Sequence, residues 1–212
     1  MARTFSDRTA AGEELAAELE RRGIDADIAV AIPRGGLPLG RAVADRLNLP
    51  LDIVVAKKIG APGNPEYAIG AVATDGSVWR NESAFDAARI DEDYFEQERQ
   101  REAENAHQKA DRYRTESAEP DFTGKRVLVV DDGVATGSTM RACIQRLRNA
   151  DAAGVIVAVP VGPPDTISEL DEMADEVVCL ESPSTFRGVG QFYTDFAQVS
   201  DEEAIEYLEE ES

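Results

Sequence analysis

The sequence predicts an α/β protein built on an open parallel β-sheet with helices on both faces. Segments with strand-like patterns alternate with segments of helical spacing along most of the 212 residues. The strand-like segments are almost entirely aliphatic, which is typical of parallel strands that are buried on both faces. The length fits one domain with elaborations, because a single core of this kind accounts for most of the chain.

We expect residues 1–212 to form this one domain. Residues 59–114 are predicted to be an insertion made of a loop, a hairpin and a charged helix, and residues 181–212 a C-terminal tail. Both segments stand outside the alternation of strands and helices. They are therefore the candidates for a small flexible loop and hood over the main sheet.

Each predicted element follows from its own pattern of apolar residues. Residues at helical spacing give helices, short aliphatic runs give buried strands, and glycine or proline marks the breaks. The opening helix should end at Gly23, and Asp75 with Gly76 is typical of a hairpin turn. The predicted elements are, in order, a helix at 9–24, a strand at 26–33, a helix at 37–49, a strand at 50–59, a hairpin at 68–79, a helix at 91–114, a strand at 125–130, a helix at 137–149, a strand at 153–161, a helix at 164–173 and a strand at 175–180.

The charge of the chain is extreme. Its formal net charge is −20, and only four of its 22 basic residues are lysine. Such a surface repels nucleic acids and anionic membranes, so neither is expected as a partner. The composition favours a halophilic protein whose self-repulsion is screened by high salt, although an acidic surface for a basic partner remains the alternative. The absence of a secretory signal or a long apolar stretch predicts a cytoplasmic protein.

Cysteine and histidine are too sparse for several kinds of catalysis. Cys143 and Cys179 are far apart in the sequence and are expected to be buried, reduced thiols. The single histidine, His107, lies within a charged run and is expected to be a solvated helix residue. Ser–His and Cys–His mechanisms are therefore not expected.

The stretch VLVVDDGVATGST at 127–139 carries the strongest chemical signal. An aliphatic strand ends in Asp131 and Asp132, whose carboxylates are acceptors suited to ligand hydroxyls or to a hydrated Mg²⁺ ion. A tight turn follows and opens a helix, where backbone N–H groups and hydroxyls suit a phosphate monoester. The turn consists of Thr136, Gly137, Ser138 and Thr139. A sugar phosphate fits both parts of this stretch, with its hydroxyls on the aspartates and its phosphate on the turn.

A second anion site is predicted after the strand at 26–33. The sequence PRGG places Arg34 beside the backbone amides of Gly35 and Gly36, so that a guanidinium and N–H groups can bind one anion. Lys57 and Lys58, near the end of the next predicted strand, add positive charge. Because consecutive strand residues point to opposite faces, only one of these two lysines is expected to serve the site.

These motifs resemble those of the type I phosphoribosyltransferases. The stretch at 127–139 resembles their signature for phosphoribosyl pyrophosphate (PRPP), and PRGG is similar to their pyrophosphate loop. The segments IPRGGLPLG, AKKIGAPGNPEYAIGAV and FYTDFAQVSDEE further resemble a group of predicted phosphoribosyltransferases whose substrate is unassigned. The resemblance covers nearly the whole chain.

The resemblance implies a role for each motif. Asp131 and Asp132 would bind the ribose hydroxyls, and Arg34 with Gly35 and Gly36 would bind the pyrophosphate. The 5′-phosphate would lie on Ala135, Thr136, Gly137, Ser138 and Thr139. Mg²⁺ would be the cofactor, held mainly by PRPP itself, with the two aspartates contributing indirectly. A flexible loop within 59–80 would close over the site, and the protein would form a homodimer.

The resemblance also implies a transfer reaction. Pyrophosphate would leave the ribose while Arg34 and Lys57 or Lys58 stabilise its growing charge, and a nitrogenous base or related amine would attack. Glu66, within the mobile loop, is the candidate for moving a proton. Ala135 stands where the 6-oxopurine branch of the family carries an aspartate, so a guanine or hypoxanthine enzyme is less expected than an adenine- or uracil-like one.

The acceptor pocket is the least specific part of the sequence. Aromatic and polar side chains in the tail suit a stacked base, and the candidates are Phe186, Arg187, Phe192 and Tyr193. The same residues equally suit core packing and a dimer edge. At the level of function, the alternative to a transferase is a regulatory protein that senses PRPP or a nucleotide without turnover. A receiver domain is excluded because no lysine follows Lys125.

Overall fold

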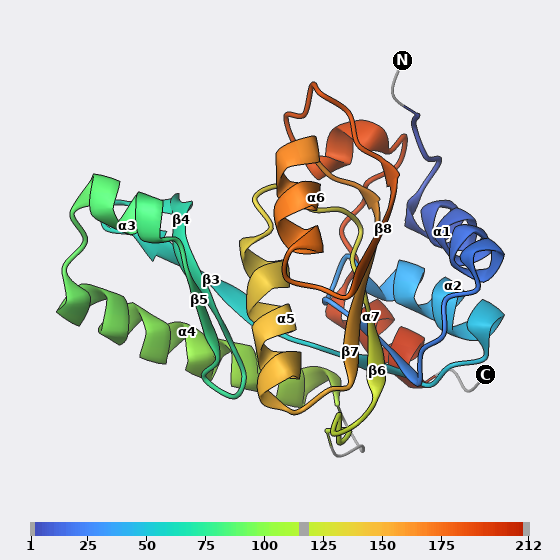
Figure 1. The fold of residues 1–212 in the computed structure, drawn as a ribbon, viewed down its shortest axis with the longest axis horizontal. Helices are drawn as coiled ribbons and strands as arrows, with labels where there is room; N and C mark the ends of the chain where they lie inside the picture. Colours follow the sequence, from blue (N-terminus) through green and yellow to red (C-terminus); the bar gives the residue numbers. More distant parts are fainter. Residues whose placement is uncertain (1–2, 115–118, 210–212) are drawn as a thin grey trace.

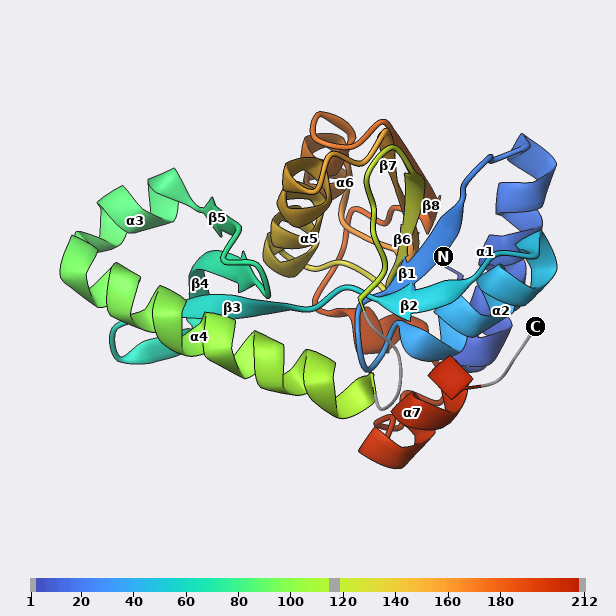
Figure 2. The same ribbon diagram turned by 90° about the horizontal axis from the view of Figure 1, so that it is seen from below.

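The computed structural model describes residues 3–114 and 119–209, and at its centre lies a five-stranded parallel sheet. The strand order is β2-β1-β6-β7-β8. These strands are β1 (Ile28–Ala31), β2 (Leu51–Ile53), β6 (Arg126–Val130), β7 (Gly154–Val161) and β8 (Glu176–Glu181). The predicted α/β class with an open parallel sheet is therefore confirmed, and Figures 1 and 2 show the sheet edge-on and from below.

Helices cover both faces of this sheet (Figure 1). One face packs against α1 (Arg8–Arg22) and α2 (Leu37–Leu47), and the other against α5 (Ser138–Asn149) and α6 (Pro164–Asp171). Strand β6 shows why both faces are aliphatic. Val127 and Val129 belong to the core cluster under α5, whereas Leu128 and Val130 belong to the cluster under α1 and α2.

The helix ends follow from local chemistry. Helix α1 begins after Asp7, whose carboxylate accepts a hydrogen bond from the backbone N–H of Ala10 at 2.8 Å. It ends at Gly23, which adopts the left-handed conformation with φ 68°, as the sequence predicts. Gly137 (φ 72°) makes the corresponding sharp turn before α5, at the carboxyl end of the central strand β6.

The segment predicted as one strand at 50–59 is in fact two strands, so that prediction was wrong. After β2, the chain leaves the parallel sheet and enters a separate antiparallel sheet of order β3-β4-β5. Val54 and Val55 are buried where the chain passes between the two sheets, so the aliphatic pattern continues through the break. The strands of the second sheet are β3 (Ala56–Ala61), β4 (Asn64–Ala73) and β5 (Val78–Arg80).

The hairpin predicted around Asp75 and Gly76 is confirmed. Strands β4 and β5 pair antiparallel with Val72 opposite Val78, and Gly76 has φ 83°. The Asp75 carboxylate accepts a hydrogen bond from the backbone N–H of Ser77 at 2.9 Å and closes the turn. Residues 59–80, the expected flexible loop, are thus largely strand.

Helix α4 (Glu92–Tyr113) confirms the predicted charged helix, and a short helix α3 (Glu82–Ala88) precedes it. Together with the antiparallel sheet these helices form a unit that projects to one side of the main sheet (Figures 1 and 2). The buried residues of α4 form a narrow seam against the rest of the protein and are Phe95, Ala106, Ala110 and Tyr113. The single histidine, His107, is exposed on this helix as expected.

The tail returns to the beginning of the chain. Phe5 exchanges backbone hydrogen bonds with Phe192 and Thr194, each at 2.8 Å, and forms an isolated parallel bridge with Tyr193. A 3₁₀ turn η1 (Val189–Phe192) and a helix α7 (Asp201–Glu209) follow β8, and the sequence did not predict this helix. The tail thereby reaches the carboxyl ends of the central strands.

Two smaller expectations concern the thiols and the membrane. Cys143 and Cys179 are free, and Cys143 is buried, whereas Cys179 is only partly so. Burial raises the pKa of both thiols, that of Cys179 to about 11, so both are protonated at neutral pH. Within residues 3–114 and 119–209, none of the helices combines the length and the apolar character that crossing a bilayer requires.

Candidate active site

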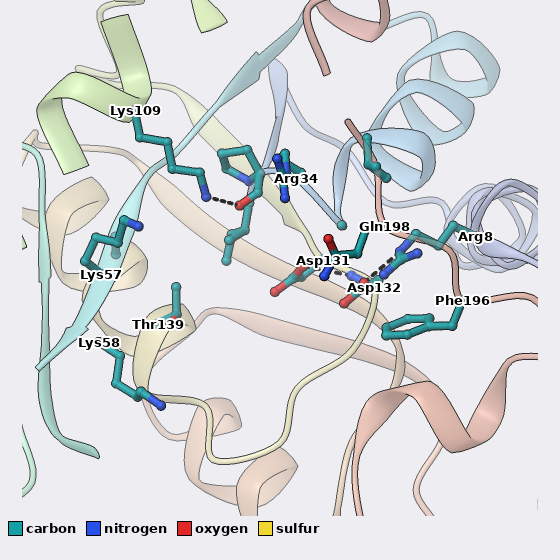
Figure 3. Close-up of a pocket in the computed structure, with 15 residues that line it drawn as sticks. Arg8, Arg34, Lys57, Lys58, Lys109, Asp131, Asp132, Thr139, Phe196 and Gln198 are labelled. Atoms are coloured by element: carbon teal, nitrogen blue, oxygen red, sulfur yellow. Dashed lines mark hydrogen bonds and ion pairs between the residues drawn. The ribbon is translucent and has the colours of Figure 1, made fainter. Parts of the chain in front are cut away.

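A cleft of about 500 Å³ lies at the carboxyl ends of β1 and β6. This is the edge at which ligands bind in open parallel sheets. The cleft is lined by Arg8, Ile32, Pro33, Arg34, Gly35, Ala56, Lys57, Lys58, Lys109, Asp131, Asp132, Thr139, Phe196, Gln198 and Val199. Figure 3 shows Asp131 and Asp132 in the middle, with the lysines of β3 on one side and Arg8 with Phe196 on the other.

The PRGG loop after β1 and the acidic loop after β6 pack directly against each other. A Cβ atom built on Gly35 would overlap the Asp132 carboxylate, because it would lie only 2.8 Å from the Cγ atom of Asp132. A Cβ atom on Gly36 would lie 2.7 Å from the carbonyl oxygens of both Ile32 and Val130. The lack of a side chain on these two glycines lets the PRGG loop lie directly against the end of β6 and its acidic pair.

Asp131 and Asp132 form a strained electrostatic pair. Burial, followed by the adjacent charge of Asp132, holds the pKa of Asp131 well above its ordinary value. Burial also raises the pKa of Asp132, and a hydrogen bond from Arg8 opposes that rise. The backbone N–H of Asp132 donates to Oδ1 of Asp131 at 2.9 Å. Ligand hydroxyls or a cation at this place would stabilise the charged forms.

Arg8 is a cleft residue that the sequence did not single out. From the first turn of α1, its Nε donates to Oδ2 of Asp132 at 2.8 Å, and its Nη1 donates to the carbonyl of Ala197 at 2.6 Å. Its guanidinium stacks 3.8 Å from the ring centre of Phe196. Arg8 therefore joins an acidic residue of β6 to the tail.

The turn before α5 has the form that the sequence predicts for a phosphate site. Gly137 and Ser138 are buried, and the hydroxyls of Thr136 and Ser138 lie 3.1 Å apart. The hydroxyl of Thr166 donates to the carbonyl of Ala135 at 2.9 Å and fixes the outer side of the turn. The turn also carries the first backbone N–H groups of α5 and the positive end of its dipole, both of which favour an anion.

Positive charge gathers on the opposite wall. Lys57 and Lys58 both line the cleft, and the expectation that only one of them serves the site stays a prediction. Their side chains extend from β3 in different directions (Figure 3). Lys109 joins them from α4, and its Nζ donates to the carbonyl of Pro33 at 2.6 Å. Burial, then repulsion from Lys57 and Arg34, lowers the pKa of Lys109 to about 8.

Asp201 holds Arg34 in place. Its carboxylate accepts from Arg34 Nη1 at 3.0 Å, from Arg112 Nη1 at 2.7 Å and from the hydroxyl of Tyr113 at 2.6 Å. The hydrogen bonds from Tyr113 and Arg34 lower the pKa of Asp201 to about 2. Burial and the bond to Asp201 raise the pKa of Tyr113 to about 12. The start of α7 and the end of α4 are therefore both tied to the PRGG loop.

The residues expected to form an acceptor pocket lie elsewhere. Phe192 and Tyr193 are buried in the core under α1, and Phe186 packs on Phe192 with ring centres 5.3 Å apart. Arg187 is exposed, and none of the four belongs to the cleft lining. Tyr193 reaches the site only through its hydroxyl, which donates to the carbonyl of Asp132 at 2.7 Å. Two tail residues further on do line the cleft.

These two residues are Phe196 and Gln198. Phe196 is 38% exposed, and it lines the cleft together with Gln198. Glu66 lies in β4, and its side chain falls outside the described part of the structure.

The residues missed by the sequence interpretation had one usable signal. Only four residues of this chain are lysine, and three of them line the cleft, so the rarity of lysine is a signal that could have marked these residues. Lys109 was hidden among the charges of a solvated helix. Arg8 offered no comparable signal, because arginine is abundant and its role depends on a contact 124 positions away.

The comparison with known families agrees with this geometry. The family model for the phosphoribosyl transferase domain matches residues 6–197. This match covers most of the chain, and the protein therefore belongs to the phosphoribosyl transferase family.

Individual relatives extend the likeness over the whole chain. A Mycobacterium tuberculosis protein that is named as a phosphoribosyl transferase without a stated acceptor is 37% identical over 205 residues, in both strain H37Rv and strain CDC 1551. The match covers 97% of this chain and 46% of those relatives, so the chain spans about half of their length. The crystal structure of TT1426 from Thermus thermophilus is 39% identical, covers 97% of each chain and has a TM-score of 0.82.

Proposed function

We propose that this protein transfers ribose 5-phosphate from PRPP to a nitrogenous base or related amine and releases pyrophosphate. Family membership supports this class of reaction. The observation that carries the proposal is the packing of Gly35 against Asp132, since it brings the PRGG loop against the acidic pair in a cleft that Thr139 of the proposed phosphate turn also lines. A ligand with phosphates at both ends of a ribose matches this order of groups.

Each part of the cleft has a role in this proposal. The hydroxyls of the ribose donate to Asp131 and Asp132, which can only accept when ionised. The 5′-phosphate binds at the turn formed by Thr136, Gly137, Ser138 and Thr139, where the N-terminus of α5 favours an anion. The pyrophosphate lies against the PRGG loop and the lysine wall.

The cationic wall would provide most of the rate enhancement. When the bond to the ribose breaks, negative charge grows on pyrophosphate, and fixed positive groups stabilise it more than they stabilise the bound substrate. Arg34, Lys57, Lys58 and Lys109 all face this region. Glu66 remains our candidate for moving a proton on the acceptor side.

Mg²⁺ is the proposed cofactor. Asp131 and Asp132 offer oxygen ligands of the kind that Mg²⁺ prefers, and their raised pKa values indicate that a nearby cation would stabilise them. Among the described residues, no cluster of three His, Cys, Asp or Glu side chains is arranged to hold a metal ion. The donors therefore suit an ion carried mainly by the phosphates of PRPP, where it would neutralise part of their charge.

The acceptor is proposed to lie against Phe196 and Gln198. An exposed ring offers a stacking surface for a planar base, and a carboxamide can both donate and accept at its edge. The stack of Arg8 on Phe196 would hold this wall beside Asp132. We infer a planar, hydrogen-bonding acceptor from these two side chains.

Release of pyrophosphate tests this proposal. The protein is incubated with PRPP, Mg²⁺ and a panel of purine and pyrimidine bases, and pyrophosphate is measured over time. Release that depends on one base is the expected result. Tight binding of PRPP without release for any base would instead support a PRPP-sensing regulator on the same fold.

A further inference from the structure

A buried arginine, Arg141, lies beside the proposed phosphate turn at residues 136–139. It belongs to the first turn of α5, and it is absent from the cleft lining. A Cβ atom built on Gly137 would lie 3.6 Å from the Nη2 atom of Arg141. The guanidinium is therefore close enough to influence an anion at the turn, although the proposed function gives it no role.

Three elements meet at this guanidinium. It stacks 4.7 Å from the ring centre of Trp79 in β5 and pairs with the carboxylate of Glu169 in α6. The backbone N–H of Arg141 donates to the carbonyl of Gly137 at 2.9 Å. Arg141 thus connects the turn to α6 and to the antiparallel sheet, whose strand β3 forms the lysine wall of the cleft.

The ion pair between Arg141 and Glu169 leaves positive charge at the turn. The side chain of Arg141 is 8% exposed, whereas that of Glu169 is 61% exposed. Because water and salt screen the exposed carboxylate more than the buried guanidinium, the two charges do not cancel at the turn. An anion on the N–H groups of the turn would be attracted by this buried cation in addition to the helix dipole.

We propose that Arg141 is a positioning residue, which favours phosphate at the turn and links occupancy of the turn to Trp79 in the antiparallel sheet. This inference rests on the part of the proposed function that places a phosphate at the turn, and not on the transfer reaction. Because Arg141 contacts both the turn and the Trp79 ring, a shift of its side chain toward a bound phosphate changes the stack. Phosphate binding is thereby coupled to the sheet that carries the lysine wall.

Arg146 provides a matched control on the same helix. The side chains of Arg141 and Arg146 are 8% and 7% exposed, and each pairs with a glutamate and contacts the unit that contains the antiparallel sheet. Arg146 follows Gly137 by nine residues, about 13 Å along the helix axis. Arg141→Gln and Arg146→Gln thus remove the same charge from α5, beside the turn and away from it.

Binding of ribose 5-phosphate is measured by calorimetry at one fixed KCl concentration, and chemical denaturation checks the fold of each variant. We expect Arg141→Gln to weaken binding by about tenfold, since a buried charge near the anion is lost. Arg141→Lys should restore most of the affinity, and Arg146→Gln should stay within about twofold of the wild type. Equal affinities for the two glutamine variants would overturn the proposal.

Trp79 fluorescence gives a second reading in the wild-type protein, because Trp79 is the only tryptophan of the chain. Its ring does not line the cleft, so a ligand there acts on it through the protein. Ribose 5-phosphate should change the emission with the midpoint found by calorimetry, and saturating ligand should leave the emission of Arg141→Gln unchanged. Binding without a change in wild-type emission would contradict the link to Trp79, and so would a lack of binding.

This inference and the proposed transfer reaction can fail separately. If ribose 5-phosphate binds with the expected pattern but no base releases pyrophosphate from PRPP, the transfer reaction falls and the role of Arg141 stands. If pyrophosphate is released while Arg141→Gln binds ribose 5-phosphate like the wild type, the proposed function stands and the role of Arg141 falls.

Discussion

Arg8 and Asp132 lie 124 positions apart in the sequence and come into contact only in the folded protein. Burial raises the pKa of both Asp131 and Asp132, the charge of Asp132 raises that of Asp131 further, and the guanidinium beside Asp132 favours its charged form. Arg8 supplies that guanidinium at 2.8 Å and holds Phe196 at the same time. We regard it as a positioning residue, since it acts through Asp132 and Phe196.

Replacing Arg8 should change how PRPP binding depends on pH. In Arg8→Gln the hydrogen bond that lowers the pKa of Asp132 is lost, so that pKa rises further. Asp132 is then protonated at a higher pH, and binding that needs its charged form falls away at a higher pH than in the wild type. The midpoint of affinity against pH, from calorimetry, measures this shift.

Arg8→Lys serves as the control, because it keeps a positive charge near Asp132. It should move the midpoint less than Arg8→Gln. An identical pH profile for the wild type and Arg8→Gln would show that Arg8 does not set the charge of Asp132.

Lys109 predicts a second pH effect of opposite sign. Its pKa of about 8 means that it is charged below this value and neutral above it. Binding of a polyanion favours the charged form, so the affinity for PRPP should fall as the pH rises through about 8. Lys109→Arg keeps its charge throughout, and its affinity should lack this fall. The contribution of Lys109 is refuted if both proteins lose affinity equally between about pH 7 and about pH 9.

The PRGG loop is the element that brings the site together. Gly35→Ala places a methyl group where the Asp132 carboxylate lies, so either that carboxylate or the loop must move. We expect the free energy of unfolding to fall by about 1–3 kcal/mol, as for other overpacked positions, and PRPP binding to weaken sharply. Chemical denaturation and calorimetry measure the two effects.

Gly188→Ala is the matched control, since a Cβ atom there would meet nothing within 4 Å. Its φ of 163° is extended backbone that any residue adopts. Wild-type PRPP affinity in Gly35→Ala would mean that the two loops need not touch for the ligand to bind.

Helix α5 couples the phosphate turn to the projecting unit. Its buried Arg146 donates to the Thr74 hydroxyl at 3.1 Å and pairs with Glu119. Arg141 lies 4.7 Å from the ring centre of Trp79 in β5 and pairs with Glu169. The antiparallel sheet that carries Lys57 and Lys58 is thus anchored to the helix whose N-terminus forms the turn.

Elements with a strong local pattern could be predicted from the sequence. The parallel strands, α1 with its Gly23 end, the hairpin at Asp75 and the charged helix all follow from periodicity or turn chemistry. The break between β2 and β3 could not be predicted, because buried Val54 and Val55 continue the aliphatic run. Helix α7 was also missed, since its acidic residues resemble a solvated end.

The residues of the site differ in the same way, because some could be predicted from the sequence and others could not. Motifs that are contiguous in the chain, PRGG and the stretch at 127–139, were found because each contains its own chemistry. Arg8, Lys109 and Phe196 come from three other segments and meet only in the folded protein. None of the aromatic candidates at 186–193 lines the cleft: Phe192 lies in the core, whereas Phe196, a few residues later, lies in the cleft.

The charge of the whole molecule separates into two regions. The chain has a net charge of −20, yet five cationic side chains, Arg8, Arg34, Lys57, Lys58 and Lys109, line one cleft. This distribution would attract small polyanions to one place and keep nucleic acids away from the rest. In the homodimer that we propose from the family resemblance, each of the two subunits would carry this negative charge.

Stability should therefore depend strongly on salt. Lowering KCl from about 2 M to about 0.1 M lengthens the Debye length from about 2 Å to about 10 Å and restores repulsion among the carboxylates. We expect the melting temperature and the helical circular dichroism signal to fall together. A melting temperature that is indifferent to KCl over this range would contradict a halophilic protein.

The most direct measurement of the central claim is the affinity for PRPP with Mg²⁺, by calorimetry, for the wild type and Asp132→Asn. We predict one site per chain and a loss of about tenfold or more in the variant, because charge-assisted hydrogen bonds to the ribose are replaced by weaker neutral ones. Equal affinities, or no binding by the wild type, would contradict the claim that this cleft holds PRPP through its acidic pair.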